Sequence, residues 1–139
     1  MTIMTESAQH RKLVQLLQNW VAVTYFDGES GPILVDSADS NRYSKPPNIC
    51  GFVPDLYARK DPVGGIIIGE AKTPGDLENH HTRAQLAAFL KECAEDASSV
   101  LVLATPWYSE RTAKGLLRHV QRRTDMNHVD AIVLEQLGA

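Results

Sequence analysis

Two strand-like runs separated by a short Pro- and Gly-rich segment place the strongest constraint on how this chain folds. Residues 53–59 mix β-branched, aromatic and apolar side chains, and residues 66–71 form a short apolar run. The segment between them reads Lys-Asp-Pro-Val-Gly-Gly, and Pro and Gly interrupt regular backbone structure. We therefore expect an antiparallel β-hairpin whose loop spans residues 60–65.

The register of this hairpin decides which polar side chains meet. The simplest register pairs Arg59 with Ile66. Counting along both strands then places Asp55 opposite Glu70, and directly opposed β-carbons lie about 4.5–5.5 Å apart. Side chains alternate along a strand, so Lys72 shares a face with Glu70. Two carboxylates at that separation repel each other, whereas a bound cation makes their proximity favourable. The hairpin thus predicts a divalent-metal site beside an ammonium group.

These residues resemble the signature of the PD-(D/E)xK nuclease superfamily, which has the restriction-endonuclease-like fold. Pro54-Asp55 and Glu70-Ala71-Lys72 match its motif. The resemblance implies that Asp55, Glu70 and the backbone carbonyl of Ala71 bind Mg²⁺, with Mn²⁺ as a substitute. It assigns Lys72 to orienting or deprotonating the attacking water and to stabilising the transition state. The implied activity is a metal-dependent nuclease, an endonuclease acting on DNA.

A further match lies on the helix expected after the hairpin. Gln85 is followed four residues later by Phe89, and RecB-like branches of the superfamily carry a glutamine and an aromatic residue at this spacing. Phe89 stands where those branches commonly have tyrosine. Residues i and i+4 share a helix face, so Gln85 is expected to support the catalytic residues while Phe89 packs. The alternative interpretation of Gln85 is an exposed helix residue.

The first helix departs from the family pattern. Many members carry an acidic residue there near the metal, but residues 11–25 contain no Asp or Glu. Only Glu6, near the helix start, could serve as an additional metal ligand or active-site acid. A site with one metal is therefore the simpler expectation.

Four cationic or imidazole side chains are candidates for nucleic-acid contacts. Arg42 and Lys45 lie in the polar segment at residues 36–51, and long loops in small domains are often functional. His81 and Arg83 lie near the start of the helix that carries Gln85. For each of them the alternative is a solvated surface residue.

The order of the predicted elements indicates the fold class. The order is helix, strand, strand, strand, helix, strand, helix, strand, which indicates an α/β chain with a mixed sheet of about five strands flanked by helices. The same order is implied by the restriction-endonuclease-like core. We expect a single domain over residues 1–139. The predicted elements span residues 6–25, 32–35, 53–59, 66–71, 78–95, 99–104, 109–123 and 129–134.

Composition narrows the class of protein. The formal net charge of −3 argues against a protein that coats nucleic acid non-specifically. No apolar stretch approaches the length of a membrane span, and the first residues lack the apolar core of a secretory signal. We expect a cytoplasmic protein, with Cys50 and Cys93 as buried, reduced thiols.

A chain this small has little surface for reading bases, so specificity is expected to come from a homodimer or a larger complex.

Cationic residues recur at helical spacing near the carboxyl end, at Arg111, Lys114, Arg118 and Arg122. A charged stripe of this kind is ordinarily the solvated side of an amphipathic helix, and contact with nucleic acid is the alternative.

Two alternatives to the nuclease stay open. The chain could be a non-catalytic module that binds nucleic acid or a protein partner on the same fold, or a structural protein. The sequence leaves open whether the substrate is a duplex, a junction, a single strand or RNA.

Overall fold

The computed structural model describes residues 2–37 and 44–137, with side chains from Ala8 onward. The described part contains three α-helices, two 3₁₀ turns and five strands in the predicted order. The helices are α1 (Thr2–Tyr25), α2 (His80–Cys93) and α3 (Glu110–Arg123), the turns are η1 (Pro74–Glu78) and η2 (Trp107–Ser109), and the strands are β1 (Leu34–Val35), β2 (Leu56–Arg59), β3 (Ile66–Ala71), β4 (Val100–Pro106) and β5 (Asp130–Gln136).

The five strands form one mixed sheet in sequential order, β1-β2-β3-β4-β5. β2 is antiparallel to both β1 and β3, whereas β3, β4 and β5 are mutually parallel. The register predicted for the hairpin is confirmed, because Arg59 pairs with Ile66 and Leu56 pairs with Gly69. The coarse prediction of an α/β chain with a five-stranded mixed sheet is likewise confirmed.

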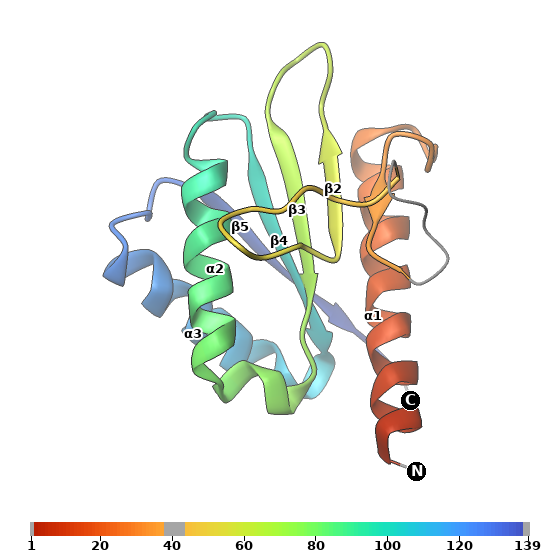
Figure 1. The fold of residues 1–139 in the computed structure, drawn as a ribbon, viewed down its shortest axis with the longest axis vertical. Coiled ribbons are helices and arrows are strands. Elements are labelled where there is room, and N and C mark those ends of the chain that lie inside the picture. Colours follow the sequence, from red (N-terminus) through yellow and green to blue (C-terminus); the bar gives the residue numbers. More distant parts are fainter. Residues whose placement is uncertain (1, 38–43, 138–139) are drawn as a thin grey trace.

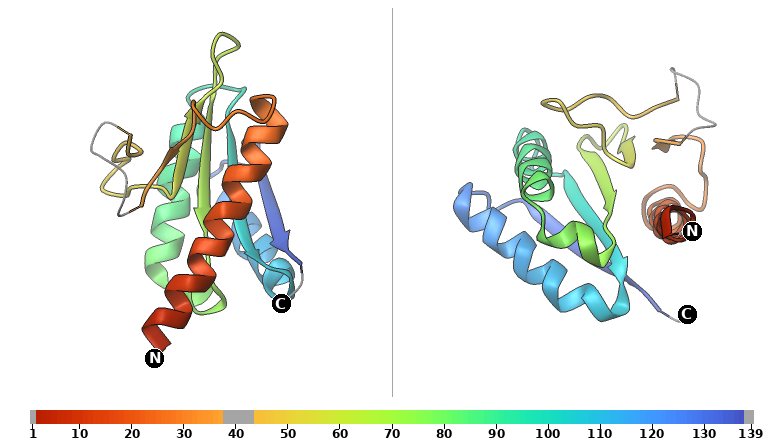
Figure 2. Two further views of the ribbon diagram at one scale, coloured as in Figure 1. Left: turned by 90° about the vertical axis from the view of Figure 1, so that its right-hand side faces the viewer. Right: turned by 60° about the horizontal axis from the view of Figure 1, so that its bottom comes forward.

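Helices cover both faces of the sheet (Figures 1 and 2). α1 packs on one face, and α2 and α3 lie together on the other. Each face has its own apolar core. On the α1 side, Leu13, Leu17 and Val21 are fully buried. Burying one such side chain contributes about 1.5–3 kcal/mol. On the other side, Phe89 of α2 is fully buried, as expected from its place on the helix.

The central strands are held between these two cores. Every residue of β3 and of β4 is buried, which agrees with the continuous apolar run predicted for β4 and is typical of parallel strands covered on both faces. The end of β3 is tied to β4 by a hydrogen bond of 2.9 Å from the Lys72 N–H to the Ala104 carbonyl. The polar residues that follow the apolar part of β3 therefore emerge at a rigid end of the sheet.

The expectation that both cysteines are buried was wrong for one of them. Cys93 is buried as expected, whereas Cys50 is exposed in the turn between the bridged residues Ile49 and Phe52, with a φ of 53°. The segment after β3 forms the 3₁₀ turn η1, and Asn79 then caps α2 by accepting hydrogen bonds from the N–H groups of His81 and Thr82.

Among the described residues, no helix is both long enough and apolar enough to span a membrane.

The loop of the β2–β3 hairpin provides a test of the packing. Gly65 has a φ of +89°, and a β-carbon there would lie 2.8 Å from the Ser98 carbonyl carbon. Gly64 has nearly the same φ, +90°, but its nearest neighbour is the Asp96 carboxylate at 3.4 Å. Left-handed backbone costs a non-glycine residue roughly 1–2 kcal/mol, and overpacking adds about 1–3 kcal/mol.

We therefore expect Gly65→Ala to lower the free energy of unfolding by about 1–3 kcal/mol more than Gly64→Ala. Chemical denaturation of the two variants measures this difference. Equal losses would show that the loop does not press against Ser98.

Candidate active site

Two hydrogen bonds from main-chain N–H groups connect Asp55 with Glu70 and Ala71 at the carboxyl end of β3. The Asp55 N–H donates to Glu70 Oε1 at 2.9 Å, and the Ala71 N–H donates to Asp55 Oδ2 at 2.8 Å. Each carboxylate thus accepts a hydrogen bond from the main chain of the neighbouring strand segment. Asp55 directly precedes β2, so the hairpin register places it beside Glu70 as predicted. The two side chains are 14% and 3% exposed.

Lys72 lies between Glu70 and α2. Its ammonium is 3.1 Å from Glu70 Oε2 and donates a hydrogen bond of 2.5 Å to Gln85 Oε1. A buried ammonium requires such partners, because removing a charge from water without them is costly. Gln85 therefore points from α2 toward Lys72, as expected. The alternative of an exposed Gln85 is wrong, since its side chain is half-buried and holds the ammonium.

His10 brings α1 into the same cluster. Its Nε2 lies 3.3 Å from Asp55 Oδ2. The hydrogen bond to Asp55 raises the pKa of His10, although burial acts in the opposite direction.

Sequence reasoning missed His10 because it sought only acidic residues on the first helix. The signal was present, since His10 precedes the buried residues Leu13 and Leu17 by three and seven positions. It therefore belongs to the helix face that packs on the sheet.

Burial and like charge make the ionised form of Glu70 unfavourable. Together they raise its pKa from an ordinary 4.5 to about 8, with burial the larger cause and the charge of Asp55 the second. Lys72 and the Asp55 N–H act in the opposite direction without cancelling the rise. A cation between the two carboxylates would favour the ionised form of both.

The donor set suits a hard divalent cation. The carboxylates of Asp55 and Glu70 and the Ala71 carbonyl offer oxygen ligands, and Mg²⁺ is commonly held by one or two carboxylates while it keeps several waters. His10 adds a ring nitrogen beside Asp55. Across residues 2–37 and 44–137, no three His, Cys, Asp or Glu side chains are grouped closely enough to form a metal site by themselves. The residues therefore fit an ion held by two carboxylates, main chain and water.

The remaining predicted residues do not join this cluster in the described part of the chain. Glu6 belongs to α1, but its side chain lies outside the described residues, as does Arg42. Lys45 is exposed. His81 is exposed and packs edge-on against Phe52, with 5.3 Å between the ring centroids. Arg83 is exposed and lines a groove between η1 and α3.

No protein-family model, curated protein or solved structure matches the chain.

The raised pKa of Glu70 gives a pH dependence for the metal-free protein. Because the folded state binds this proton more tightly than the unfolded state, the resulting stability is present below about pH 4.5 and is lost as the pH rises through about 8. We expect the melting temperature without metal to fall over this range, and Glu70→Gln to flatten the fall.

The matched control is Glu78→Gln, the same substitution at an exposed carboxylate. Thermal melts in metal-free buffer between pH 5 and pH 9 would measure all three proteins. An equally steep fall in Glu70→Gln would show that Glu70 does not control it.

Proposed function

We propose that this chain is a metal-dependent nuclease of the PD-(D/E)xK type, with DNA as its substrate and Mg²⁺ as its cofactor. One observation carries the proposal: Asp55, Glu70, Lys72 and Gln85, which come from three separate segments, meet in one hydrogen-bonded cluster. The order of helices and strands supports our proposal that the fold has a restriction-endonuclease-like core. We also propose that the protein is cytoplasmic.

Each residue of the cluster has a role that its contacts support. Asp55, Glu70 and the Ala71 carbonyl would hold the cation, which when bound lowers the pKa of a coordinated water and offsets charge on the phosphate. The Lys72 ammonium lies beside Glu70, where it would orient the attacking water and stabilise the transition state. Gln85 fixes the position of that ammonium by accepting its hydrogen bond.

His10 extends this set. Its ring holds Asp55 from the α1 side and offers a nitrogen to the cation. We propose that His10 takes the place that the family pattern gives to an acidic residue on the first helix.

One observation favours the non-catalytic alternative. Both oxygens of Glu70 already accept hydrogen bonds, one from the Asp55 N–H and one from Lys72. The cluster could therefore stabilise the fold of a binding module without any metal. The two functions differ in metal affinity and in cleavage.

The nuclease proposal predicts that Lys72→Met separates metal binding from chemistry. The ligands of the cation remain, so affinity for Mn²⁺ measured by calorimetry should be retained. Loss of one transition-state stabiliser typically lowers the rate about 10²–10³-fold, and nicking of supercoiled DNA should fall by that amount. The control is Lys91→Met, which removes an exposed ammonium on α2, outside the cluster. Cleavage at the wild-type rate by Lys72→Met would contradict the assigned role.

Asp55→Asn should instead lose metal binding and cleavage together, because it removes a charged ligand while keeping the size of the side chain. Calorimetry and nicking are measured on the same preparation. Wild-type protein without metal affinity, or an Asp55→Asn variant that still nicks DNA, would favour the binding module.

A further inference from the structure

The outer strand β5 presents a long unpaired edge. The opposite edge strand, β1, has two residues, whereas β5 has seven, Asp130–Gln136. One edge of β5 pairs with β4, and no strand pairs with its other edge in the described part of the chain. Proteins commonly protect such edges with Lys, Pro or a short strand, but β5 contains neither residue type. Its central residues, 131–134, are only half-buried.

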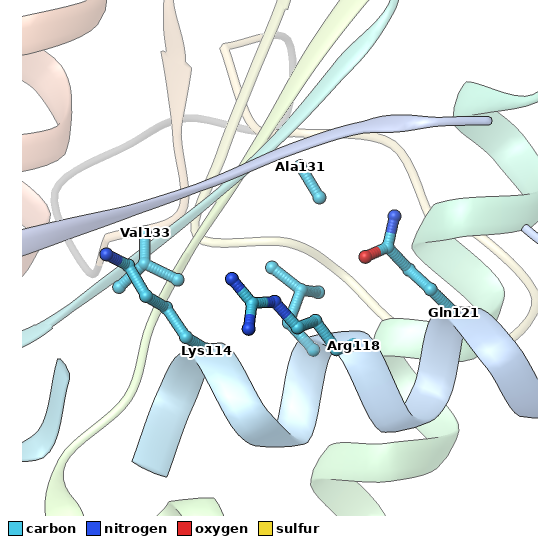
Figure 3. A pocket seen from close by; sticks show the side chains of 6 residues that line it. Lys114, Arg118, Gln121, Ala131 and Val133 are labelled. Carbon is cyan, nitrogen blue, oxygen red and sulfur yellow. The ribbon is translucent and has the colours of Figure 1, made fainter. Parts of the chain in front are cut away.

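A pocket with two cationic side chains lies against the face of β5 that carries Ala131 and Val133. It lies between α3 and β5, and Figure 3 shows Lys114 and Arg118 reaching from α3 toward the strand. Lys114 is paired with Glu110 at 2.7 Å. Arg118 has no ion pair among the described residues. The pocket is lined by Lys114, Leu117, Arg118, Gln121, Ala131 and Val133.

An acidic side chain of β5 lies on the same face but away from Arg118. Ala131 and Val133 line the pocket, and alternation along the strand puts Glu135 on their face. Within its own chain, Glu135 lies beside another carboxylate, that of Glu110, which raises the pKa of Glu135, while Lys114 acts in the opposite direction. Glu135 therefore has a like charge next to it in the monomer, and it lies two positions beyond Val133, the last residue of β5 that lines the pocket.

We propose that a second copy of this chain pairs with β5 in antiparallel orientation, so that two five-stranded sheets join into one continuous sheet. Full overlap of the two β5 strands puts the two-fold axis at Val133. In this register Glu135 of one copy lies opposite Ala131 of the other. Its carboxylate therefore falls beside the unpaired Arg118, and the symmetry forms this ion pair twice.

The affinity between the two copies and the register of their β5 strands come from different interactions. Main-chain hydrogen bonds along β5 and burial of the half-exposed residues 131–134 supply the attraction. Exposed ion pairs contribute little affinity, but charge complementarity selects one register and disfavours others. The Arg118–Glu135 pairs therefore distinguish this dimer from one formed through another face.

Sedimentation equilibrium of the metal-free protein tests this interface without reference to nuclease activity. Wild-type protein should show a concentration-dependent mass approaching twice 15.4 kDa. Arg118→Glu and Glu135→Arg each create two like-charge contacts and should weaken the dimer roughly tenfold. The double variant R118E/E135R restores opposite charges and should recover the wild-type affinity.

Arg122→Glu is the control, since it reverses a charge on the same helix outside the pocket and should leave the dimer intact. A wild-type mass that stays monomeric at all concentrations would overturn the proposal. So would single variants that dimerise as wild type does, a double variant that does not recover, or DNA bound through Arg118 by a protein that stays monomeric.

Discussion

The candidate site depends on two main-chain hydrogen bonds that cross between the start of β2 and the end of β3. They run from the Asp55 N–H to Glu70 and from the Ala71 N–H to Asp55. Each carboxylate is held by the backbone of the other's segment, so the hairpin register keeps the two acids side by side. The resulting repulsion and burial raise the pKa of Glu70. Lys72 offsets part of this cost, and a bound cation would offset more.

The helices on the two faces of the sheet add further side chains to the pair of Asp55 and Glu70. β3 lies in the middle of the sheet between two apolar cores, so α1 and α2 approach its carboxyl end from opposite faces (Figure 1). α1 brings His10 to Asp55, and α2 brings Gln85 to Lys72. Side chains on packed helices are held more firmly than those on loops, which is the arrangement that a catalytic site requires.

The features that depend on residues close together in the sequence were predicted correctly. The hairpin register followed from strand runs and a Pro- and Gly-rich loop, and the element order followed from helical and strand periodicity. Contacts between layers were harder to predict. Gln85 was placed correctly because a family motif pointed to it, whereas His10 was missed because its contact with Asp55 depends on how α1 crosses the sheet. Cys50 is exposed because it lies in a turn that the residue pattern did not predict.

The proposed function requires that the cluster around Asp55 and Glu70 binds a divalent cation. Paramagnetic broadening by Mn²⁺ in amide and aromatic NMR spectra tests this binding, because broadening falls steeply with distance from the ion. We expect substoichiometric Mn²⁺ to broaden the amide signals of Asp55, Ala71 and Lys72 first, together with the ring signals of His10, and excess Mg²⁺ to reverse the effect. Broadening confined to other parts of the chain, or none at all, would contradict this expectation.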